Sequence, residues 1–197
     1  MAVAKHPQAP KNNDDSPYVS RGGLKLASVA DALKLDFRGK TVLDVGSSTG
    51  GFTDYALQHG AVKVYAVDSG RDQLHPSLHG NPGIELHERT DIRNFSPDTT
   101  PDIVVIDASF ISLRELLPHI AKISGKKTQI VAMVKPQFEG PAADKNRGII
   151  KNEHRRRDIL KDFEVWARER FVILDKKDSA VAGAKGNQER FYLLKNA

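Results

Sequence analysis

Cysteine is absent from this sequence of 197 residues. Its absence excludes disulfide scaffolds, thiol nucleophiles and cysteine-ligated zinc sites, and it fits a reducing compartment. Long hydrophobic runs are missing too, since no apolar stretch approaches the roughly 20 residues that a membrane-spanning helix needs. Residues 1–17 contain no segment resembling a signal peptide. We therefore expect a flexible tail there, no membrane partner and a cytoplasmic location.

The charge balance is only mildly basic, with 30 Lys and Arg against 25 Asp and Glu and a formal net charge of +5. A basic excess of this size is compatible with a nucleic-acid partner but decides little by itself. Hydrophobic residues make up 39% of the chain, which is enough for a real core. The length suits one domain.

Strand-like and helix-like segments alternate after the tail. Apolar spacing predicts helices at Ser20–Leu35, Gly50–His59, Leu113–Ile123 and Glu153–Arg170. It predicts strands at Thr41–Val45, Val62–Val67, Ile84–Glu88, Ile103–Ile106, Gln129–Val134, Phe171–Asp175 and Glu189–Leu194. This alternation indicates the α/β class, with a mostly parallel sheet, helices on both faces and an antiparallel hairpin at the end.

One long irregular stretch, Pro136–Asn152, follows the strand Gln129–Val134 directly. Ligands of open α/β sheets bind beyond the carboxyl ends of strands, and loops of this length are often functional.

The sharpest local motif is LDVGSSTGGFTD, which spans Leu43 to Asp54 at a predicted strand-to-helix turn. Its Gly-x-x-x-Gly-Gly spacing differs from the dinucleotide fingerprint. Asp44 stands just before the first glycine, where it would repel a pyrophosphate. A carboxylate there suits a ligand with an ammonium group and a sulfonium centre, such as S-adenosylmethionine.

Two further aspartates complete the predicted cofactor site. Asp68, after the second strand, can accept both hydroxyls of an adenosine ribose, and Asp91 can accept a hydrogen bond from the adenine amino group. Each could instead be a helix-capping or turn aspartate. The predicted cofactor-binding set is Asp44, Gly46, Ser47, Ser48, Thr49, Gly50, Gly51, Phe52, Asp68, Asp91 and Asp107.

Six motifs give the chain a family resemblance. They are YVSRGGLKL (18–26), LDVGSSTGGFTD (43–54), ERTDIR (88–93), DASFISL (107–113), VKPQFE (134–139) and GNQERFYLL (186–194). In these strings and their order the sequence resembles the TlyA (hemolysin A) type of RNA methyltransferase, a branch of the FtsJ-like ribose 2′-O-methyltransferases.

The resemblance implies a Rossmann-like fold that binds S-adenosylmethionine and has an antiparallel last strand. It also implies a catalytic Lys-Asp-Lys-Glu set, which motif by motif falls on Lys25, Asp107, Lys135 and Glu189. The implied substrate is structured RNA, most simply ribosomal RNA or ribosomal subunits. No metal is implied.

The implied chemistry is in-line transfer of a methyl group to a ribose hydroxyl. The hydroxyl proton must leave as the new bond forms, and a lysine amine can accept it when burial or a neighbouring positive charge lowers its pKa. Lys135 is the expected general base, because it ends a central strand. Lys25 is expected to orient the ribose, and Asp107 and Glu189 to hold the two amines. Taken one at a time, Lys25 and Glu189 could equally be ordinary surface residues.

The sequence departs from the family in two places. Relatives usually carry a small S4-like RNA-binding domain ahead of YVSRGG, whereas residues 1–17 alone precede it here. The expected organisation is therefore a tail at 1–17 and a methyltransferase domain at 18–197, with RNA target selection left open. Asp91 stands where we expect Asn in many relatives, and either side chain can accept a hydrogen bond.

Other residues could contact RNA. The aromatic residues Phe110 and Phe138 flank the expected cleft and could stack on a base or belong to the core. Basic residues that could follow a phosphate backbone, or simply face solvent, are Arg21, Lys145, Arg147, Lys151, Arg155, Arg156 and Arg157.

Several other functions are disfavoured. His75 and His79 lack a third zinc ligand, and Ser47, Ser48 and Ser109 lack a histidine partner. The alternatives that stay open are a methyltransferase with a non-RNA substrate, a hemolysin-like cytolytic protein, and a cofactor-binding protein without catalysis. The Asn/Asp-Pro-Pro-aromatic string of base-amine methyltransferases is absent, and nothing in the sequence resembles a pore.

Overall fold

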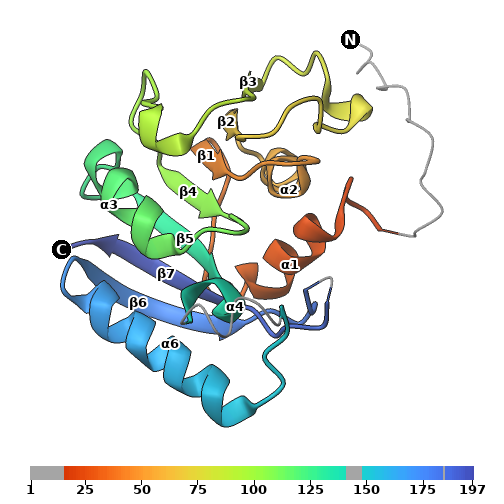
Figure 1. The fold of residues 1–197 in the computed structure, drawn as a ribbon. Helices are drawn as coiled ribbons and strands as arrows, with labels where there is room; N and C mark the ends of the chain where they lie inside the picture. Colours follow the sequence, from red (N-terminus) through yellow and green to blue (C-terminus); the bar gives the residue numbers. More distant parts are fainter. Residues whose placement is uncertain (1–15, 141–147, 184) are drawn as a thin grey trace.

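The computed structural model describes residues 16–140, 148–183 and 185–197. Seven strands form one sheet in the order β3-β2-β1-β4-β5-β7-β6. The strands are β1 (Thr41–Val45), β2 (Lys63–Val67), β3 (Ile84–His87), β4 (Ile103–Ile106), β5 (Gln129–Val134), β6 (Phe171–Asp178) and β7 (Arg190–Asn196). The helices are α1 (Arg21–Ala30), α2 (Gly51–Gln58), α3 (Leu113–Ile123), α4 (Pro136–Glu139) and α6 (Glu153–Arg168), with short 3-10 turns η1 (Pro76–Leu78) and η2 (Ile92–Asn94) (Figure 1).

Strands β1 to β5 pair in parallel, whereas β7 runs antiparallel to both β5 and β6. The predicted antiparallel ending is therefore confirmed, and β7 lies between β5 and β6. The crossover through α6 places β6 at the sheet edge, and the chain then returns along β7.

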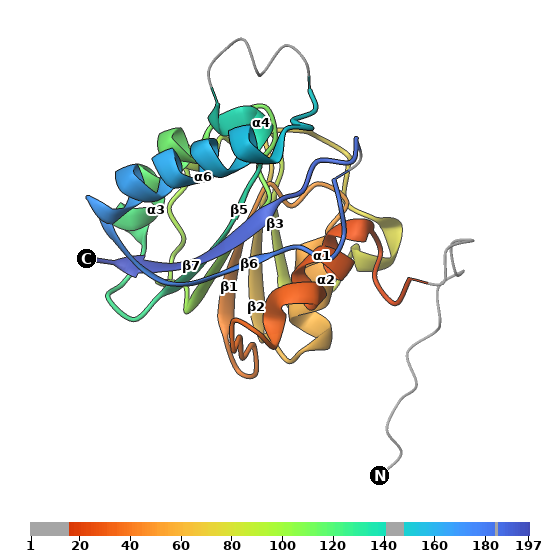
Figure 2. The ribbon, with the colours of Figure 1, turned by 90° about the horizontal axis from the view of Figure 1, so that it is seen from below.

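Helices cover both faces of the sheet, as predicted. One core cluster joins α3 and α6 to β-strand residues such as Leu43, Val104 and Tyr192. The other joins α1 and α2 to residues such as Val105 and Phe191. Figure 2 shows these two pairs of helices on opposite sides of the sheet. Because neighbouring strand residues face opposite ways, β1, β2, β4, β5 and β7 each contribute residues to both clusters.

The bounds of β1, β4, β5 and α3 match the prediction, and those of β2, β3, α2, α6 and β7 differ from it by one or two residues at an end. Two elements, α1 and β6, differ by more. Helix α1 stops at Ala30 rather than Leu35, since Lys34 adopts a positive φ of 53° that no α-helix continues through. Strand β6 runs on to Asp178 because it pairs with β7 as far as Arg190. Its charged second half hid this pairing from an analysis of apolar spacing.

Candidate active site

Three parallel strands end together at one edge of the sheet. The register pairs Val45 of β1 with Ile106 of β4, and Ile106 with Ala132 of β5. On the other side of β5, Val134 pairs with Arg190 of the antiparallel β7. The end of β5 and the beginning of β7 therefore meet at the same edge, so Lys135 and Glu189 occupy the next facing positions.

The first ion pair at this edge joins Lys135 to Asp107. The Nζ atom of Lys135 lies 2.5 Å from Oδ1 of Asp107 and donates a hydrogen bond of 2.7 Å to Oγ of Ser109. The Lys135 side chain is only 9% exposed and the Asp107 side chain 21%. A lysine held this way is fixed in direction and points its amine at the loop that follows β4.

The second ion pair joins Lys25 of α1 to Glu189. Its atoms Nζ and Oε2 are 2.6 Å apart, and the two side chains are 11% and 3% exposed. Gly183 lies against this pair, since a Cβ atom there would be 2.8 Å from Oε1 of Glu189. Any larger residue at position 183 would push the carboxylate away.

The strand pleat explains why both pairs face α1. Val105, Met133 and Phe191 belong to the core cluster beneath α1 and α2. Asp107 follows Val105 by two positions, and Lys135 follows Met133 by two. Glu189 precedes Phe191 by two positions, because β7 runs in the opposite direction. Alternation therefore sends all three side chains to the face that carries Lys25. The structure thus brings the four predicted residues together as two lysine–carboxylate pairs at one edge.

The glycine-rich turn lies beside this set. Gly46 has a φ of 80°, and a Cβ atom there would be 2.8 Å from the carbonyl oxygen of Asp107. Ser48 and Gly50 also have positive φ angles, of 46° and 89°. The predicted need for glycine at the first position of the turn follows from both the dihedral angle and the close approach of the two loops.

At the end of β1 and in the turn that follows it, two buried polar atoms have no hydrogen-bond partner among the described residues. They are Oδ1 of Asp44 and Oγ of Ser47. The Asp44 side chain is fully buried, and its other oxygen accepts a 2.6 Å hydrogen bond from Thr53. Burial raises the pKa of Asp44 to about 7, against the lowering effect of the Thr53 hydrogen bond. Unpaired buried groups of this kind are expected where a ligand supplies the missing partner.

The two other predicted aspartates make local contacts. Asp68 accepts hydrogen bonds from the backbone N–H groups of Ser48 (2.8 Å) and Gly70 (2.7 Å). It thereby joins the glycine turn to the loop after β2. Asp91 caps the turn η2 and accepts a 2.6 Å hydrogen bond from the Arg93 guanidinium. This is the capping arrangement that the sequence left open, and the adenine contact stays a prediction.

The remaining predicted cofactor residues divide into two groups. Ser48 and Thr49 are exposed at the turn, where Ser48 Oγ hydrogen-bonds Gln73. Gly51 and Phe52 instead pack α2 against its neighbours. A Cβ atom on Gly51 would lie 2.9 Å from the backbone N of Gly23 in α1, and the Phe52 ring lies 6.1 Å from that of Phe191.

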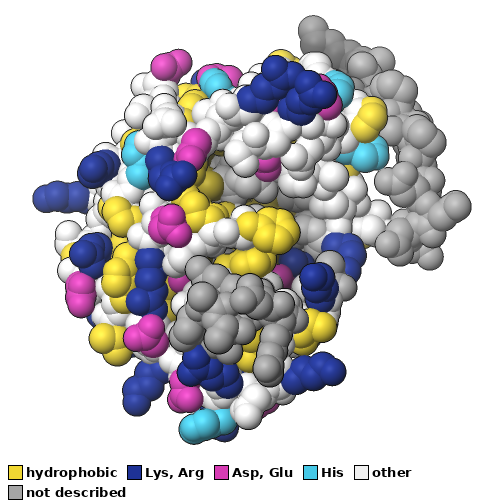
Figure 3. All heavy atoms as spheres, in the orientation of Figure 1, with side chains coloured by type: hydrophobic (Ala, Val, Ile, Leu, Met, Phe, Trp, Pro, Cys, Tyr) yellow, Lys and Arg dark blue, Asp and Glu magenta, His cyan; other side chains and the backbone are white. Residues whose placement is uncertain are grey.

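An exposed aromatic residue stands next to the first ion pair. Phe110 is 91% exposed and has a φ of 66°, which is unusual for a bulky residue. Its ring centroid lies 5.3 Å from that of Phe138 in α4. In Figure 3 hydrophobic side chains gather near the centre of the face, with Lys and Arg side chains scattered around them.

Sequence reasoning missed two residues here. It considered Ser109 only as a nucleophile, whereas the Ser109 hydroxyl accepts from Lys135. It assigned nothing to Glu139, whose side chain is 1% exposed and accepts 2.6 Å hydrogen bonds from Ser112 Oγ and from the Leu113 backbone N–H. Glu139 therefore ties α4 to the loop that carries Phe110. Both lie in motifs that the family resemblance had singled out.

One predicted RNA contact is wrong. Arg156 is only 4% exposed and is engaged inside the protein, so it cannot follow a phosphate backbone. Arg21, Lys151 and Arg157 are exposed, as that role requires. Arg155 is partly buried. Lys145 and Arg147 lie outside the described residues.

The disfavoured sites find no support in the described structure. His75 hydrogen-bonds Ser77, and His79 hydrogen-bonds the carbonyl of Leu74. Among the described residues no group of three or more His, Cys, Asp or Glu side chains could hold a metal ion. Within the same residues, no helix is both long and apolar enough to cross a membrane.

The strand order, the antiparallel β7 and the turn after β1 together define the Rossmann-like methyltransferase fold. The fold of an S-adenosylmethionine-dependent methyltransferase from Mesorhizobium loti supports this class, with a TM-score of 0.60 at 14% identity, covering 88% of this chain and 100% of that one. The chain belongs to the FtsJ-like methyltransferase family, whose model matches residues 18–196.

Two curated relatives are close in sequence. The 23S rRNA (cytidine-2′-O)-methyltransferase TlyA of Campylobacter jejuni is 38% identical over 178 residues, which are 89% of this chain and 70% of that protein. The 16S/23S rRNA (cytidine-2′-O)-methyltransferase TlyA of Mycobacterium tuberculosis is 35% identical over 188 residues, covering 93% and 70%. A solved structure from Streptococcus thermophilus, under a provisional hemolysin name, superposes with a TM-score of 0.88 at 36% identity, covering 94% and 70%. The family predicted from the six motifs is confirmed.

Proposed function

We propose that this protein transfers the methyl group of S-adenosylmethionine to a ribose 2′-hydroxyl of ribosomal RNA. The observation that carries the proposal is the convergence of two lysine–carboxylate pairs, Lys135–Asp107 and Lys25–Glu189, beside a glycine-rich turn. The two curated relatives act on cytidine 2′-hydroxyls of rRNA, by their names, and they supply the substrate class.

The residues of the turn fit the cofactor. Asp44 Oδ1 and Ser47 Oγ are buried without a hydrogen-bond partner in the described structure, so a bound ligand with polar groups would satisfy both. Gly46 has no side chain, so the turn can pass close to the Asp107 backbone, and its own backbone is free to approach a ligand. We assign Asp44, Gly46 and Ser47 to the amino-acid part of the cofactor, and Asp68 to its ribose.

When bound, S-adenosylmethionine supplies a methyl group on a sulfonium, which is already a good leaving group. Positioning therefore provides much of the rate enhancement. The protein must hold the hydroxyl oxygen in line with the bond between the sulfur and the methyl group, and it must accept the hydroxyl proton. We assign the acceptance of this proton to Lys135. Its ammonium, which is paired with Asp107 in the structure, must first release a proton, and Asp107 and Ser109 then hold the neutral amine in a fixed direction.

Lys25 has the complementary task of holding the ribose. Its amine is nearly buried against Glu189, so it can donate a hydrogen bond in only a narrow range of directions. A hydroxyl placed between two such amines has its lone pairs and its proton in defined positions. Fixed geometry of this kind, set before the substrate arrives, is what lowers an activation barrier.

Recognition of the target nucleotide is assigned to Phe110 and Phe138. A ring that is 91% exposed, beside a second aromatic ring, offers a surface on which an unpaired base can stack. The exposed Arg21, Lys151 and Arg157 would contact phosphates around it.

The direct test is to incubate the protein with radiolabelled S-adenosylmethionine and separate small and large ribosomal subunits, and then to map any 2′-O-methyl nucleotide. Label is expected in rRNA at one or a few positions. A matched reaction with DNA of similar length is expected to incorporate none. Incorporation into DNA or protein, or no incorporation into either subunit, would contradict the proposal.

A further inference from the structure

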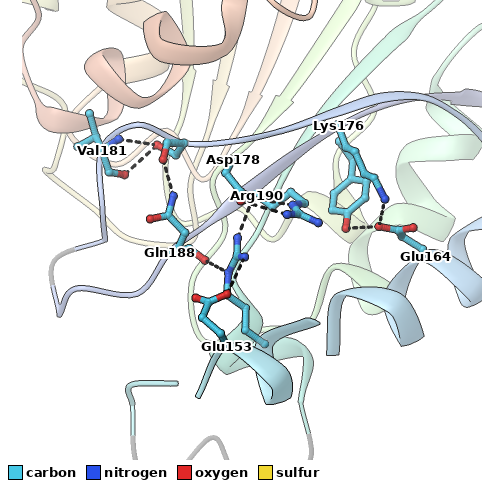
Figure 4. A network of polar contacts seen from close by, with 10 residues as sticks. Glu153, Glu164, Lys176, Asp178, Val181, Gln188 and Arg190 are labelled. Carbon is cyan, nitrogen blue, oxygen red and sulfur yellow. Dashed lines mark hydrogen bonds and ion pairs between the residues drawn. The ribbon is translucent and has the colours of Figure 1, made fainter. Parts of the chain in front are cut away.

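A polar network lies on the α6 face of the sheet, behind Glu189. Arg156 of α6 donates a 2.7 Å hydrogen bond to Oδ1 of Asp178 and a 3.0 Å hydrogen bond to the backbone carbonyl of Gln188. Arg190 donates to both oxygens of Asp178, at 2.6 and 3.0 Å. Figure 4 shows Asp178 and Arg190 pointing toward one another, with Gln188 nearby. One carboxylate at the end of β6 is therefore shared by two guanidinium groups.

This network fixes the residues on either side of Glu189. Gln188 is held through its carbonyl by Arg156, and its side-chain amide donates to the carbonyl of Ser179. Arg190 is held by Asp178. The carbonyl of Glu189 itself accepts a 3.0 Å hydrogen bond from the N–H of Ser179. The backbone at position 189 therefore has little freedom to rotate.

Successive side chains of a strand point to opposite faces of the sheet, and this alternation decides where the Glu189 side chain points. With Arg190 directed toward α6, the side chain of Glu189 is directed to the opposite face, where it meets Lys25 at 2.6 Å. The Arg156 network lies behind the sheet and contacts neither lysine of the proposed site in any described interaction. Its influence on the site must pass through the backbone.

We propose that Arg156 is a positioning residue: together with Asp178 and Arg190 it sets the direction of Glu189 and so the position of the Lys25 amine. The idea that this matters for methyl transfer rests on the function proposed above. The positioning itself does not, because it concerns an ion pair present in the structure.

A purely structural role would not need this chemistry. Arg156 is 4% exposed, and burying a charged group is costly unless its partners are well placed. An apolar side chain of similar volume would fill the same space. An apolar side chain can replace neither the ion pair with Asp178 nor the hydrogen bond to the Gln188 carbonyl, and the second of these contacts lies one residue from Glu189.

The test uses the full chain and observes Lys25 by NMR, through the correlation of its 13Cε and 15Nζ atoms, which is assigned by its loss in Lys25→Arg. Arg156→Met is expected to shift this signal in the same direction as Glu189→Gln, and Arg156→Lys is expected to restore part of the shift. Arg168→Ala is the matched control, because Arg168 lies on the same helix and pairs at 3.9 Å with Glu164. It should leave the signal unchanged.

A Lys25 signal that stays at its wild-type position in Arg156→Met would overturn the proposal, even if the melting temperature falls. Where Arg156→Met does not fold, Asp178→Asn replaces it, since this change keeps the side-chain shape but removes the charge that both arginines share. The same two outcomes then apply to Asp178→Asn.

Kinetics link the positioning to catalysis. Once the wild type is shown to methylate RNA, Arg156→Met should lower kcat by up to about a hundredfold, the loss expected when a distant mutation misplaces a reacting group by about 1 Å. The KM for the cofactor should not change. In a Glu189→Gln background the same change should have no further effect on kcat, because the two residues act through one path. Additive losses would overturn the proposal. A wild-type protein without methyl transfer would count against the proposed function only, and the NMR comparison would still decide the positioning.

Discussion

The two halves of the candidate site are built in opposite ways. The glycine-rich turn comes from neighbouring residues, and it leaves Asp44 Oδ1 and Ser47 Oγ without partners among the described residues. The lysine–carboxylate set comes from distant segments, and its four charges are paired, Lys25 with Glu189 and Lys135 with Asp107.

This difference suggests two roles. A buried group without a partner gains free energy when a ligand supplies one, so the turn is suited to hold a cofactor tightly. Paired charges gain little from a further partner, but their directions are fixed. The paired set is therefore suited to orient a substrate and to move a proton.

The largest expected effect separates catalysis from binding. Lys135→Ala should lower the rate of methyl transfer by roughly a hundred- to ten-thousand-fold, the range of general-base contributions, while calorimetric affinity for S-adenosylmethionine stays near wild type. Lys135→Gln should behave alike, because an amide cannot accept the proton. The exposed Lys122 provides a control in Lys122→Ala, which should keep full activity. Wild-type turnover in either Lys135 variant would remove Lys135 from the mechanism.

The next effect concerns the turn. Gly46→Ala would force a Cβ atom to within 2.8 Å of the Asp107 carbonyl oxygen at a φ of 80°. We expect a loss of about 1–3 kcal/mol in the free energy of unfolding and at least about tenfold weaker cofactor binding (about 1.4 kcal/mol).

Gly39→Ala is the matched control for Gly46→Ala. Gly39 also has a positive φ, of 68°, but nothing lies within 4 Å of an added Cβ atom. It should lose some stability and no cofactor affinity. Equal cofactor binding by the two variants would show that the close approach at Gly46 has no part in holding the ligand.

A smaller effect is expected at Phe110, the exposed aromatic residue of the candidate site. Phe110→Ala should raise the KM for RNA about tenfold, near the lower end of the free energy that stacking a base on an aromatic ring contributes. The melting temperature should not change, because Phe110 is 91% exposed. The comparison is with Phe110→Tyr, which keeps an aromatic face and should keep the wild-type KM. An unchanged KM in Phe110→Ala would rule out stacking.

The last effect is on stability alone. Burial raises the pKa of Asp44 from 3.8 to about 7, so the folded protein binds this proton more tightly than the unfolded chain. The contribution of Asp44 to the stability of the wild type should therefore fall as the pH rises from about 4 to about 7 and change little above that.

Asp44→Asn has no such proton to lose. The melting temperature of this variant minus that of the wild type should therefore rise by several degrees between about pH 4 and pH 7, since about 1 kcal/mol corresponds to roughly 2–4 °C in a chain of this size. Thermal unfolding at a series of pH values measures it. A constant difference across the series would mean that Asp44 ionises normally in the folded protein.

The sequence could predict the parts of this protein that local residues control. The bounds of β4, β5 and α3 follow from their apolar spacing, and the turn at Gly46 follows from its glycines and from Asp44. In these segments the side chains that determine the structure lie within a few positions of one another, so the sequence itself shows their pattern.

The pairing of charges and the environment of Arg156 depended on the tertiary structure. Arg156 belongs to a run of three arginines that looks like a solvated surface, yet it is buried because β6 brings Asp178 beneath α6. Family resemblance named Lys25 and Glu189 as members of one set, but their ion pair joins residues more than 160 positions apart. Only the register of β7 against β5 and the packing of α1 on the sheet bring them together. An ion pair forms where the fold places both partners, and the residues between them in the sequence do not indicate this pairing.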